Sequence, residues 1–506
     1  MLARPSGAVR TCVLVVLLAA TGTAILELVR EQTGTPGFFV GLGLALLPVP
    51  PLMAAFRWLG RAAPSPWRQL MFCFGWGACT AALMAILANS FATQWIAAAT
   101  ADPSDADQLG SVAIAPVVEE SAKAAALLLV FVFRRRHFTG PADGFVVAGF
   151  TATGFAFTEN ILYLGNAFDE DLTEGTGVLD SVTAATFFVR IVMSPFAHPL
   201  FTVLTGLGFG AAALTARRSR RIILPLLGLV SAMGLHALWN SSSRFGEYGF
   251  YVVYGCVMVP VFGLLAGAAV RIRRLRLRAV ATELAVYAAA GWIGRAEVPA
   301  LASLPARSLA RALARRTGGR AAGRAVAQYE ADATALALLR YRARRGGPAR
   351  EPDFAGRERE LLHRLWLRRA TAGPALARAA VMEELLPPWF DPLGPRPGPP
   401  FGPSPPAVPV PAAALSAVPS PDAVPVPAPR HADRSRADPG GPDAGPADAG
   451  RTGQTGVGRA DAGRADAGRA DAGRADVRRS GPWTSATSAG SPSSRPCVLP
   501  GGDGSR

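Results

Sequence analysis

The chain has 506 residues, half of them hydrophobic and 17% charged, with a formal net charge of +16. The mean hydropathy is +0.25 although the C-terminal part is polar and rich in proline, so the apolar residues must concentrate in the first half. This excludes an ordinary soluble globular protein. No nucleic-acid partner is expected, because the arginines lie in short loops beside apolar segments and along an Ala/Arg-rich stretch.

Long apolar stretches between Thr11 and Val270 predict a membrane domain. Runs of about twenty nearly uncharged residues recur there, long enough to cross roughly 30 Å of hydrocarbon as helix. We predict an all-α polytopic membrane helix bundle with about eight transmembrane helices. The expected spans are 11–29, 36–56, 70–98, 111–133, 144–166, 183–214, 222–243 and 249–270. The first is alternatively a cleaved signal peptide, which leaves the remaining topology unchanged.

The charges of the loops predict the orientation. Arginines follow the second, fourth, sixth and eighth spans, at Arg57 to Arg68, Arg134 to Arg136, Arg217 to Arg221 and Arg271 to Arg278. The opposite loops are acidic, with Asp102, Asp105, Asp107 and the group from Asp169 to Glu174. By the positive-inside rule we expect a multi-pass protein of the inner (plasma) membrane with both termini in the cytoplasm.

Composition divides the chain into three regions. Residues 1–278 form the expected transmembrane domain. Residues 279–390 are basic and Ala/Arg-rich, and their apolar spacing predicts cytoplasmic amphipathic helices that either rest on anionic lipid headgroups or form a soluble linker. Residues 391–506 are predicted to be disordered, with a proline-rich stretch and a repeated Gly-Arg-Ala-Asp-Ala unit. The proline-rich stretch is a candidate docking segment for cytoplasmic partners, although low complexity alone explains it equally well.

The fourth span carries charges that a membrane helix normally avoids. Glu119, Glu120 and Lys123 lie within about one helical turn, and Lys123 can pair with either carboxylate. Each ionisable residue near mid-bilayer costs at least about 2.5 to 3.5 kcal/mol, so each requires a partner or a function. A salt bridge that packs helices is the simplest explanation of one pair. A second adjacent carboxylate favours acid–base chemistry instead, because one of two close carboxyl groups is driven towards the protonated form.

Polar residues recur in the next three spans. Glu159 and Asn160 lie in the fifth, His198 beside Pro199 in the sixth, and His236 with Asn240 in the seventh. Counted from the outer end of each span at about 1.5 Å per residue, Glu120, Glu159, His198 and His236 share a layer about 10 to 15 Å below the extracytoplasmic face. We therefore predict one shared site, with Asn160 and Asn240 as uncharged donors and Arg190 lying above it.

In order, these segments resemble the PrsW family of intramembrane peptidases, which is distantly similar to the CAAX-prenyl and bacteriocin-processing (CPBP) membrane proteases. The matching motifs are Glu119-Glu120-x-x-Lys123, Phe155-x-x-x-Glu159-Asn160, His198-Pro-Leu-Phe and His236-x-x-x-Asn240. Relative to the CPBP pattern, Glu159 replaces a histidine, and Lys123 lies one position early. The resemblance covers roughly residues 10–270.

The resemblance implies a peptidase that cuts a membrane-anchored protein near its extracytoplasmic side, an anti-sigma factor or another regulator. We expect Glu119 or Glu120, aided by Glu159 or His198, to take a proton from the attacking water. His236 and Asn240 are expected to hold the oxyanion, with Lys123 and Asn160 in support. Alternatively His198, His236 and Glu159 bind zinc, a combination that metallopeptidases use, and the sequence slightly favours glutamate chemistry without metal.

Two other functional classes remain open. A proton- or ion-coupled transporter also gathers ionisable groups in mid-membrane, but it usually has an internal repeat, which the two halves of this domain lack. An inactive membrane scaffold that recruits partners through its tail is the third possibility.

Overall fold

The computed structural model of this protein describes residues 7–100, 109–134, 138–177, 180–246, 248–346 and 353–384. Within those ranges every regular element is helical and no strand occurs, which confirms the predicted all-α fold. All described helices belong to one unit of the chain. The predicted disordered tail at 391–506 and the acidic residues Asp102, Asp105 and Asp107 lie outside the described residues.

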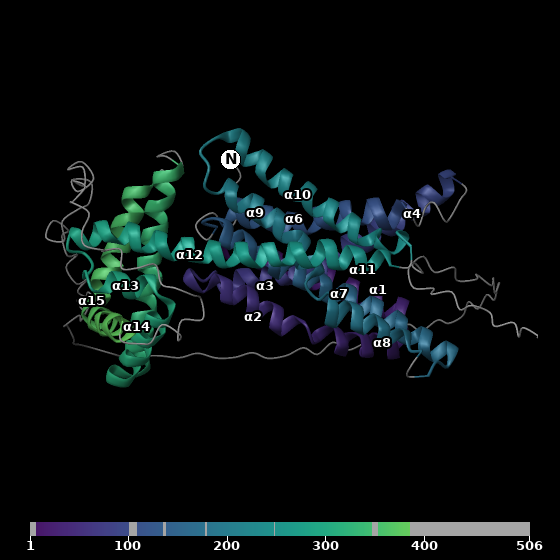
Figure 1. The fold of residues 1–506 in the computed structure, drawn as a ribbon, viewed down its shortest axis with the longest axis horizontal. Coiled ribbons are helices and arrows are strands. Elements are labelled where there is room, and N and C mark those ends of the chain that lie inside the picture. Colours follow the sequence, from purple (N-terminus) through teal and green to yellow (C-terminus); the bar gives the residue numbers. More distant parts are fainter. Residues whose placement is uncertain are drawn as a thin grey trace, which may run out of the picture. The chain divides into compact units, whose positions relative to one another are not determined.

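The helices follow one another with short connections (Figure 1). The membrane region comprises α1 (Gly7–Leu46), α2 (Val49–Leu59), η1 (Gly60–Ala62), α3 (Trp67–Gly75), η2 (Trp76–Ala81), α4 (Ala82–Thr100), η3 (Gly110–Ile114), α6 (Ala115–Phe133), α7 (Pro141–Glu174), α8 (Val182–Phe187), η5 (Phe188–Met193), α9 (Ala197–Ala212), α10 (Arg218–Asn240), η6 (Ser242–Arg244), α11 (Gly249–Val253), η7 (Tyr254–Met258) and α12 (Val259–Ala289). Beyond it come α13 (Glu297–Ala302), α14 (Leu304–Gly346) and α15 (Phe354–Glu384).

Six helical segments of the described chain are long and apolar enough to cross a membrane. They are Thr11–Ala62, Trp67–Ala98, Pro141–Glu174, Val182–Ala212, Arg218–Asn240 and Gly249–Ala289. The first covers two expected spans, and its helix α1 breaks between them at Gly34, where φ is 66°. The fourth expected span corresponds to η3 and α6, whose three charges keep it out of this group. A multi-pass membrane protein is confirmed, while the count of eight crossings stays a prediction.

Helix α7 lies at the centre of the bundle, and most of its side chains from Ala142 to Ala167 are buried. Glycines allow its neighbours to approach closely. A Cβ atom on Gly144 would lie 1.9 Å from the carbonyl oxygen of Gly206 in α9, and one on Gly154 would lie 2.0 Å from that of Phe74 in α3. Small residues at such crossings let helix backbones touch, which is how membrane helices gain packing energy. The packing fixes α9 and α3 against the helix that carries Glu159.

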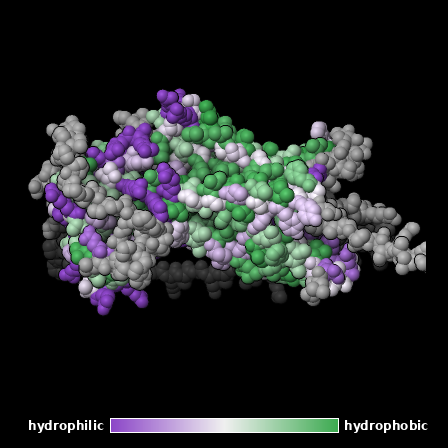
Figure 2. Space-filling model, viewed as in Figure 1, coloured by the Kyte–Doolittle hydropathy of each residue, from purple (hydrophilic) through white to green (hydrophobic). Residues whose placement is uncertain are grey.

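Arginines of α12 and α14 bind residues at the ends of membrane helices. Arg276 of α12 is buried and forms an ion pair with Asp143 at the start of α7, with 2.6 Å between Nη2 and Oδ2. Arg307 of α14 donates from Nη1 to the carbonyl oxygen of Ala62, 2.9 Å away. Figure 2 shows hydrophobic side chains over much of the membrane helices, while hydrophilic side chains gather over the helices that follow. The boundary predicted at residue 278 falls within α12 and stays a prediction.

Candidate functional site

The two adjacent glutamates and the lysine of α6 point into the bundle. Pro116 in the first turn suits a helix start, since its missing N–H would have no helical partner there. The side chains of Glu119, Glu120 and Lys123 are buried, those of Glu120 and Lys123 completely. Apolar surroundings make each charge dependent on its neighbours.

The ammonium of Lys123 joins four groups from three helices. Its Nζ lies 2.9 Å from Glu120 Oε1, 3.3 Å from Glu119 Oε2 and 3.1 Å from His198 Nδ1. It also lies 3.8 Å from the centre of the Phe155 ring, a cation–π contact. Lys123 therefore links both glutamates of α6 to α7 and α9, beyond the pairing within α6 that spacing predicted.

Glu120 is held on both of its oxygens. Thr202 of α9 donates its hydroxyl to Oε2 at 2.9 Å, and His236 Nδ1 of α10 lies 3.3 Å from Oε1. The His236 ring stacks on Phe201, with ring centres 4.7 Å apart and planes 18° from parallel. Glu120 thus ties α6 to both histidine-bearing helices.

His198 connects the buried glutamates to Glu159. It is the second residue of α9, directly after the interruption at Ser194 to Phe196. Its Nε2 lies 2.5 Å from Glu159 Oε2. Because the ammonium of Lys123 can only donate, Nδ1 of His198 accepts and Nε2 carries the proton that it donates to Glu159. A continuous hydrogen-bonded chain therefore runs from Glu159 through His198 and Lys123 to Glu119 and Glu120.

Arg190 also belongs to this cluster. It lies in the π-helical turn η5, and such turns often occur at functional sites. Its Nη2 donates to Glu159 Oε2 at 2.6 Å, its Nε donates to Asn160 Oδ1 at 2.8 Å, and its guanidinium carbon lies 3.8 Å from the Tyr163 ring centre. The expectation that Arg190 lies above the site therefore needs correcting, because the turn shifts its register towards Glu159.

Asn240 lies apart from the charged groups. Its Nδ2 donates to the carbonyl oxygen of Ser111 in η3, 2.8 Å away. The structure thus brings together Glu119, Glu120, Lys123, Glu159, Asn160, His198 and His236, while the amide of Asn240 packs η3 against the end of α10. Its predicted role in holding the oxyanion stays a prediction.

Comparison with known families identifies the domain around this site. A family model described as "PrsW family intramembrane metalloprotease" matches residues 65–265. This domain belongs to the PrsW family. The match includes every residue of the cluster, and it makes the domain an intramembrane protease. Searches of curated proteins and of solved structures found no match.

The description of the PrsW family as metalloproteases raises the question of which residues could bind a metal ion. Glu119, His198 and His236 each offer an atom within 4.8 Å of the others, and one carboxylate with two imidazoles is a common zinc-binding combination. Nδ1 of His236 is buried and makes no hydrogen bond, although Glu120 Oε1 lies 3.3 Å from it. These residues fit a metal, provided that His198 gives up its hydrogen bond to Lys123 or Glu159. The set differs from the predicted one, because Glu119 takes the place of Glu159.

The side chains of the PrsW site differ in how far they are exposed. The side chains of Arg190 and Glu159 are 21% and 18% exposed, whereas those of Glu119 and Glu120 are 8% and 0% exposed. Both donors to Glu159 bind Oε2, so Oε1 has no hydrogen-bond partner within the described ranges. The flank formed by Glu159 and Arg190 is therefore the most exposed part of the charged cluster.

Sequence reasoning missed Thr202 and underestimated Arg190. Thr202 lies four residues after His198, so both lie on one face of α9, and this spacing was the available signal. For Arg190 the signal was a charge inside an apolar span, which normally marks a functional position. Its reach depends on the π-helical turn, which residue counting does not reveal.

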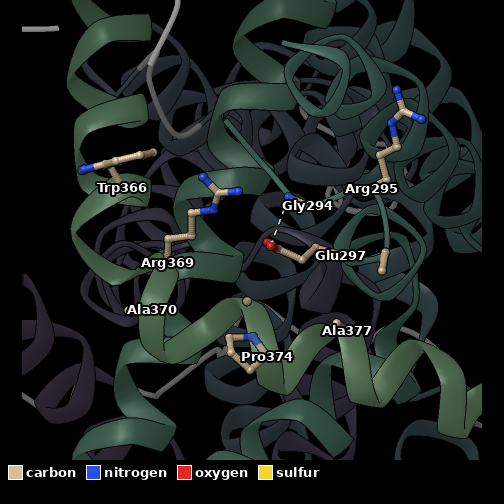
Figure 3. Close-up of a pocket in the computed structure, with 10 residues that line it drawn as sticks. Gly294, Arg295, Glu297, Trp366, Arg369, Ala370, Pro374 and Ala377 are labelled. Carbon is tan, nitrogen blue, oxygen red and sulfur yellow. Dashed lines mark hydrogen bonds between the residues drawn. The ribbon is translucent and has the colours of Figure 1, made fainter. Parts of the chain in front are cut away.

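A cavity lies outside the PrsW domain, among α13, α15 and the turn before α13. It measures about 640 Å³, and Glu297, one of its lining residues, accepts a hydrogen bond from the Gly294 N–H at 3.0 Å (Figure 3). Tyr329 donates to the other carboxylate oxygen at 2.6 Å. Both oxygens of this carboxylate are thus satisfied from within the chain, and the cavity shares no residue with the charged cluster.

Proposed function

We propose that Glu159 is the general base of a peptidase that hydrolyses a membrane-anchored protein. The observation that carries this proposal is the free Oε1 of Glu159 on the accessible flank of the cluster, beside Oε2, which His198 and Arg190 hold. A base must reach the proton that it removes, and Glu119 and Glu120 lie deeper. Glu159 therefore takes over the leading role that the sequence suggested for Glu119 or Glu120.

Proton transfer is the first part of the mechanism. Oε1 of Glu159 takes the proton of the attacking water while the water oxygen bonds to the scissile carbonyl carbon. The same carboxyl group then returns that proton to the departing amine. The two hydrogen bonds on Oε2 hold the carboxylate in place and leave Oε1 towards the open side.

Arg190 supplies the positive charge that this reaction needs. Its Nε donates to Asn160 and its Nη2 to Glu159, and its guanidinium lies over the Tyr163 ring on the exposed flank of the cluster. A guanidinium N–H beside the base can donate to the carbonyl oxygen as negative charge develops on it. In this proposal Arg190 stabilises the oxyanion, the role that the sequence suggested for His236 and Asn240.

The buried charges of α6 hold the site in shape. Lys123 fixes His198 in the tautomer that donates to Glu159, and Glu120 fixes Lys123 and His236. Glu119, His198 and His236 are the residues that would hold a metal ion. A bound zinc would polarise the scissile carbonyl and acidify water.

The expected substrate class follows from the resemblance and the topology. A single-span membrane protein cut near its extracytoplasmic side, an anti-sigma factor or another regulator, fits a site with one open flank between membrane helices. The arginine-bearing loops favour an inner-membrane location with the termini in the cytoplasm.

Cleavage in membranes tests the proposal. The chain is co-expressed with tagged single-span proteins from its own genome, and the wild type is compared with Glu159→Gln, Glu120→Gln and His236→Ala. Glu170→Gln is the matched control, because Glu170 lies exposed on the same helix α7. Loss of a general base typically lowers the rate by about 10²- to 10⁴-fold.

The outcomes separate the functional classes. A fragment that appears with the wild type and the control but not with Glu159→Gln supports the peptidase with this base. If the fragment persists in Glu159→Gln at an unchanged rate, this base is wrong. If the variants instead abolish a proton or solute flux and no protein is cut, the transporter alternative replaces the peptidase.

A further inference from the structure

Helix α14 is a hairpin of two antiparallel arms. Its backbone leaves the helical conformation at Gly318 and Gly319, and Gly319 has a φ of 68°. Two contacts connect the arms. Arg311 Nη1 lies 3.0 Å from Glu330 Oε2, and Arg307 Nη2 donates to the Thr334 hydroxyl at 2.9 Å. The tip of the hairpin therefore lies at the two glycines.

Four exposed arginines surround this tip. Arg315 and Arg316 end the first arm, while Arg320 and Arg324 begin the second. A Cβ atom on Gly323 would lie 2.4 Å from Arg315 Cγ, so the stem of Arg315 lies directly against the opposite arm. Close packing thus concentrates four positive charges within about two turns of helix on each side of the bend.

These four arginines have no carboxylate partner among the described residues, and no acidic residue lies near them in the sequence. Elsewhere in the helices after the membrane region Arg311 pairs with Glu330, Arg368 with Asp332 and Arg344 with Glu283. No Asp or Glu occurs between Glu297 and Glu330. No ion pair joins the four tip arginines to any other described residue.

The base of the hairpin is attached to the membrane domain. Arg307 binds the carbonyl oxygen of Ala62, the residue at which the membrane-crossing segment Thr11–Ala62 ends. Gly319 lies twelve residues beyond Arg307, so a rise of about 1.5 Å per residue places the tip within about 18 Å of that contact. A surface this close to the lipid–water boundary can reach the headgroups.

We propose that the arginine tip, formed by Arg315, Arg316, Arg320 and Arg324, docks on the anionic phospholipid headgroups of the membrane that the protein spans. Guanidinium groups bind phosphate oxygens with paired N–H donors, and basic residues beside a membrane are attracted to its anionic lipids. Membrane anchoring keeps the tip next to this ligand permanently, whereas a nucleic acid would have to be recruited. The proposal does not depend on the peptidase assignment.

Hydrogen exchange of the intact chain tests the docking. The full-length protein is placed in nanodiscs of phosphatidylcholine alone or mixed with phosphatidylglycerol, and amide exchange is followed for peptides covering residues 308–326. We expect exchange at the tip to slow by at least about fivefold in the anionic discs and to recover at high salt, which screens charge. Arg320→Gln with Arg324→Gln should remove the difference. Arg359→Gln with Arg378→Gln is the matched control, because both are exposed arginines of α15.

Each result decides the proposal. Protection that requires phosphatidylglycerol, low salt and the tip arginines supports docking on lipid. Equal exchange in both kinds of disc overturns it, as does protection that the tip variant retains. A stronger protection by an added RNA oligonucleotide in phosphatidylcholine discs overturns it as well, in favour of a nucleic-acid partner.

Discussion

Lys123 Nζ lies 2.9 Å from Glu120 Oε1, and both side chains are completely buried. A charge pair in such surroundings needs both partners, because removing one leaves the other charge without compensation. The pair also sits between the two histidine-bearing helices, so its loss affects the site as well as the fold.

Replacing Lys123 by Met should destabilise the protein strongly. Two buried carboxylates would lose their shared cation, at a cost of about 3 to 5 kcal/mol. Thermal unfolding of the purified protein in nanodiscs measures the change. The double variant Lys123→Met with Glu120→Gln removes the charge of both partners and should recover part of the loss. A double variant less stable than Lys123→Met would contradict the coupling.

Arg190 should affect the reaction more than the fold. Arg190→Gln removes the charge beside Glu159, and we expect kcat/KM to fall by about 10²- to 10³-fold, the usual effect of losing one oxyanion donor. Because Arg190 is partly exposed, the unfolding temperature should change little. Arg190→Lys should recover some kcat, since it keeps a charge but loses the fork of donors. An effect on KM alone would instead assign Arg190 to substrate binding.

Metal content distinguishes the two possible donor sets. Glu119 lies with His198 and His236 in the compact set, whereas Glu159 is held by Arg190. Metal analysis of the purified protein should therefore show a loss in Glu119→Gln and in His236→Ala but not in Glu159→Gln. If Glu159→Gln loses the metal and Glu119→Gln keeps it, the donor set suggested by the sequence replaces the one described above.

The sequence predicted most of the site because charges inside apolar spans are conspicuous. Two considerations were enough to group the ionisable residues of the site: the cost of burying a charge in the membrane, and a common depth in their spans. These residues are Glu119, Glu120, Glu159, His198 and His236. The hydrogen-bond and ion-pair partners of each side chain could not be predicted from the sequence. Spacing predicts neighbours within a helix, whereas the contact of Lys123 with His198 depends on how α6 packs against α9.

The positions of the helices were predicted best where the length of an apolar stretch is enough to locate a membrane span. The break in α1 at Gly34 lies between the first two expected spans, as the glycine and the following Pro36 suggest. The π-helical turns at η2, η3, η5 and η7 were not predicted, because an extra residue in a helical turn leaves no mark in hydropathy. The displacement of Arg190 towards Glu159 follows from one of them.

Stability should fall with rising pH because of Glu330, which lies in α14 outside the membrane helices. Burial raises the pKa of its carboxyl group from 4.5 to about 7, and Arg311 and Arg307 only partly oppose this. The folded state therefore binds this proton more tightly than the unfolded state. Its contribution is full below about pH 4.5 and is lost as the pH rises through about 7, with an upper bound of about 3 kcal/mol.

Hydrogen exchange of α14 between pH 5 and 8 measures this effect, with Glu330→Gln compared at each pH to cancel the intrinsic pH dependence of exchange. The wild type should lose protection relative to the variant as the pH rises. A constant difference between the two would mean that Glu330 titrates normally.

Substituting Gly144 should separate the two halves of the site. A methyl group there would lie 1.9 Å from the backbone oxygen of Gly206, so α9 must move away from α7. Overpacking of this kind costs about 1 to 3 kcal/mol. His198 on α9 should then lose its 2.5 Å contact with Glu159 on α7, and cleavage should fall even where the protein remains folded. Gly263→Ala is the control, because no atom lies within 4 Å of its added Cβ on α12.

Alanine has a higher helix propensity than glycine, so Gly263→Ala should be as stable as the wild type or more so. Equal activity of Gly144→Ala and Gly263→Ala would show that the approach of α7 to α9 does not set the catalytic geometry.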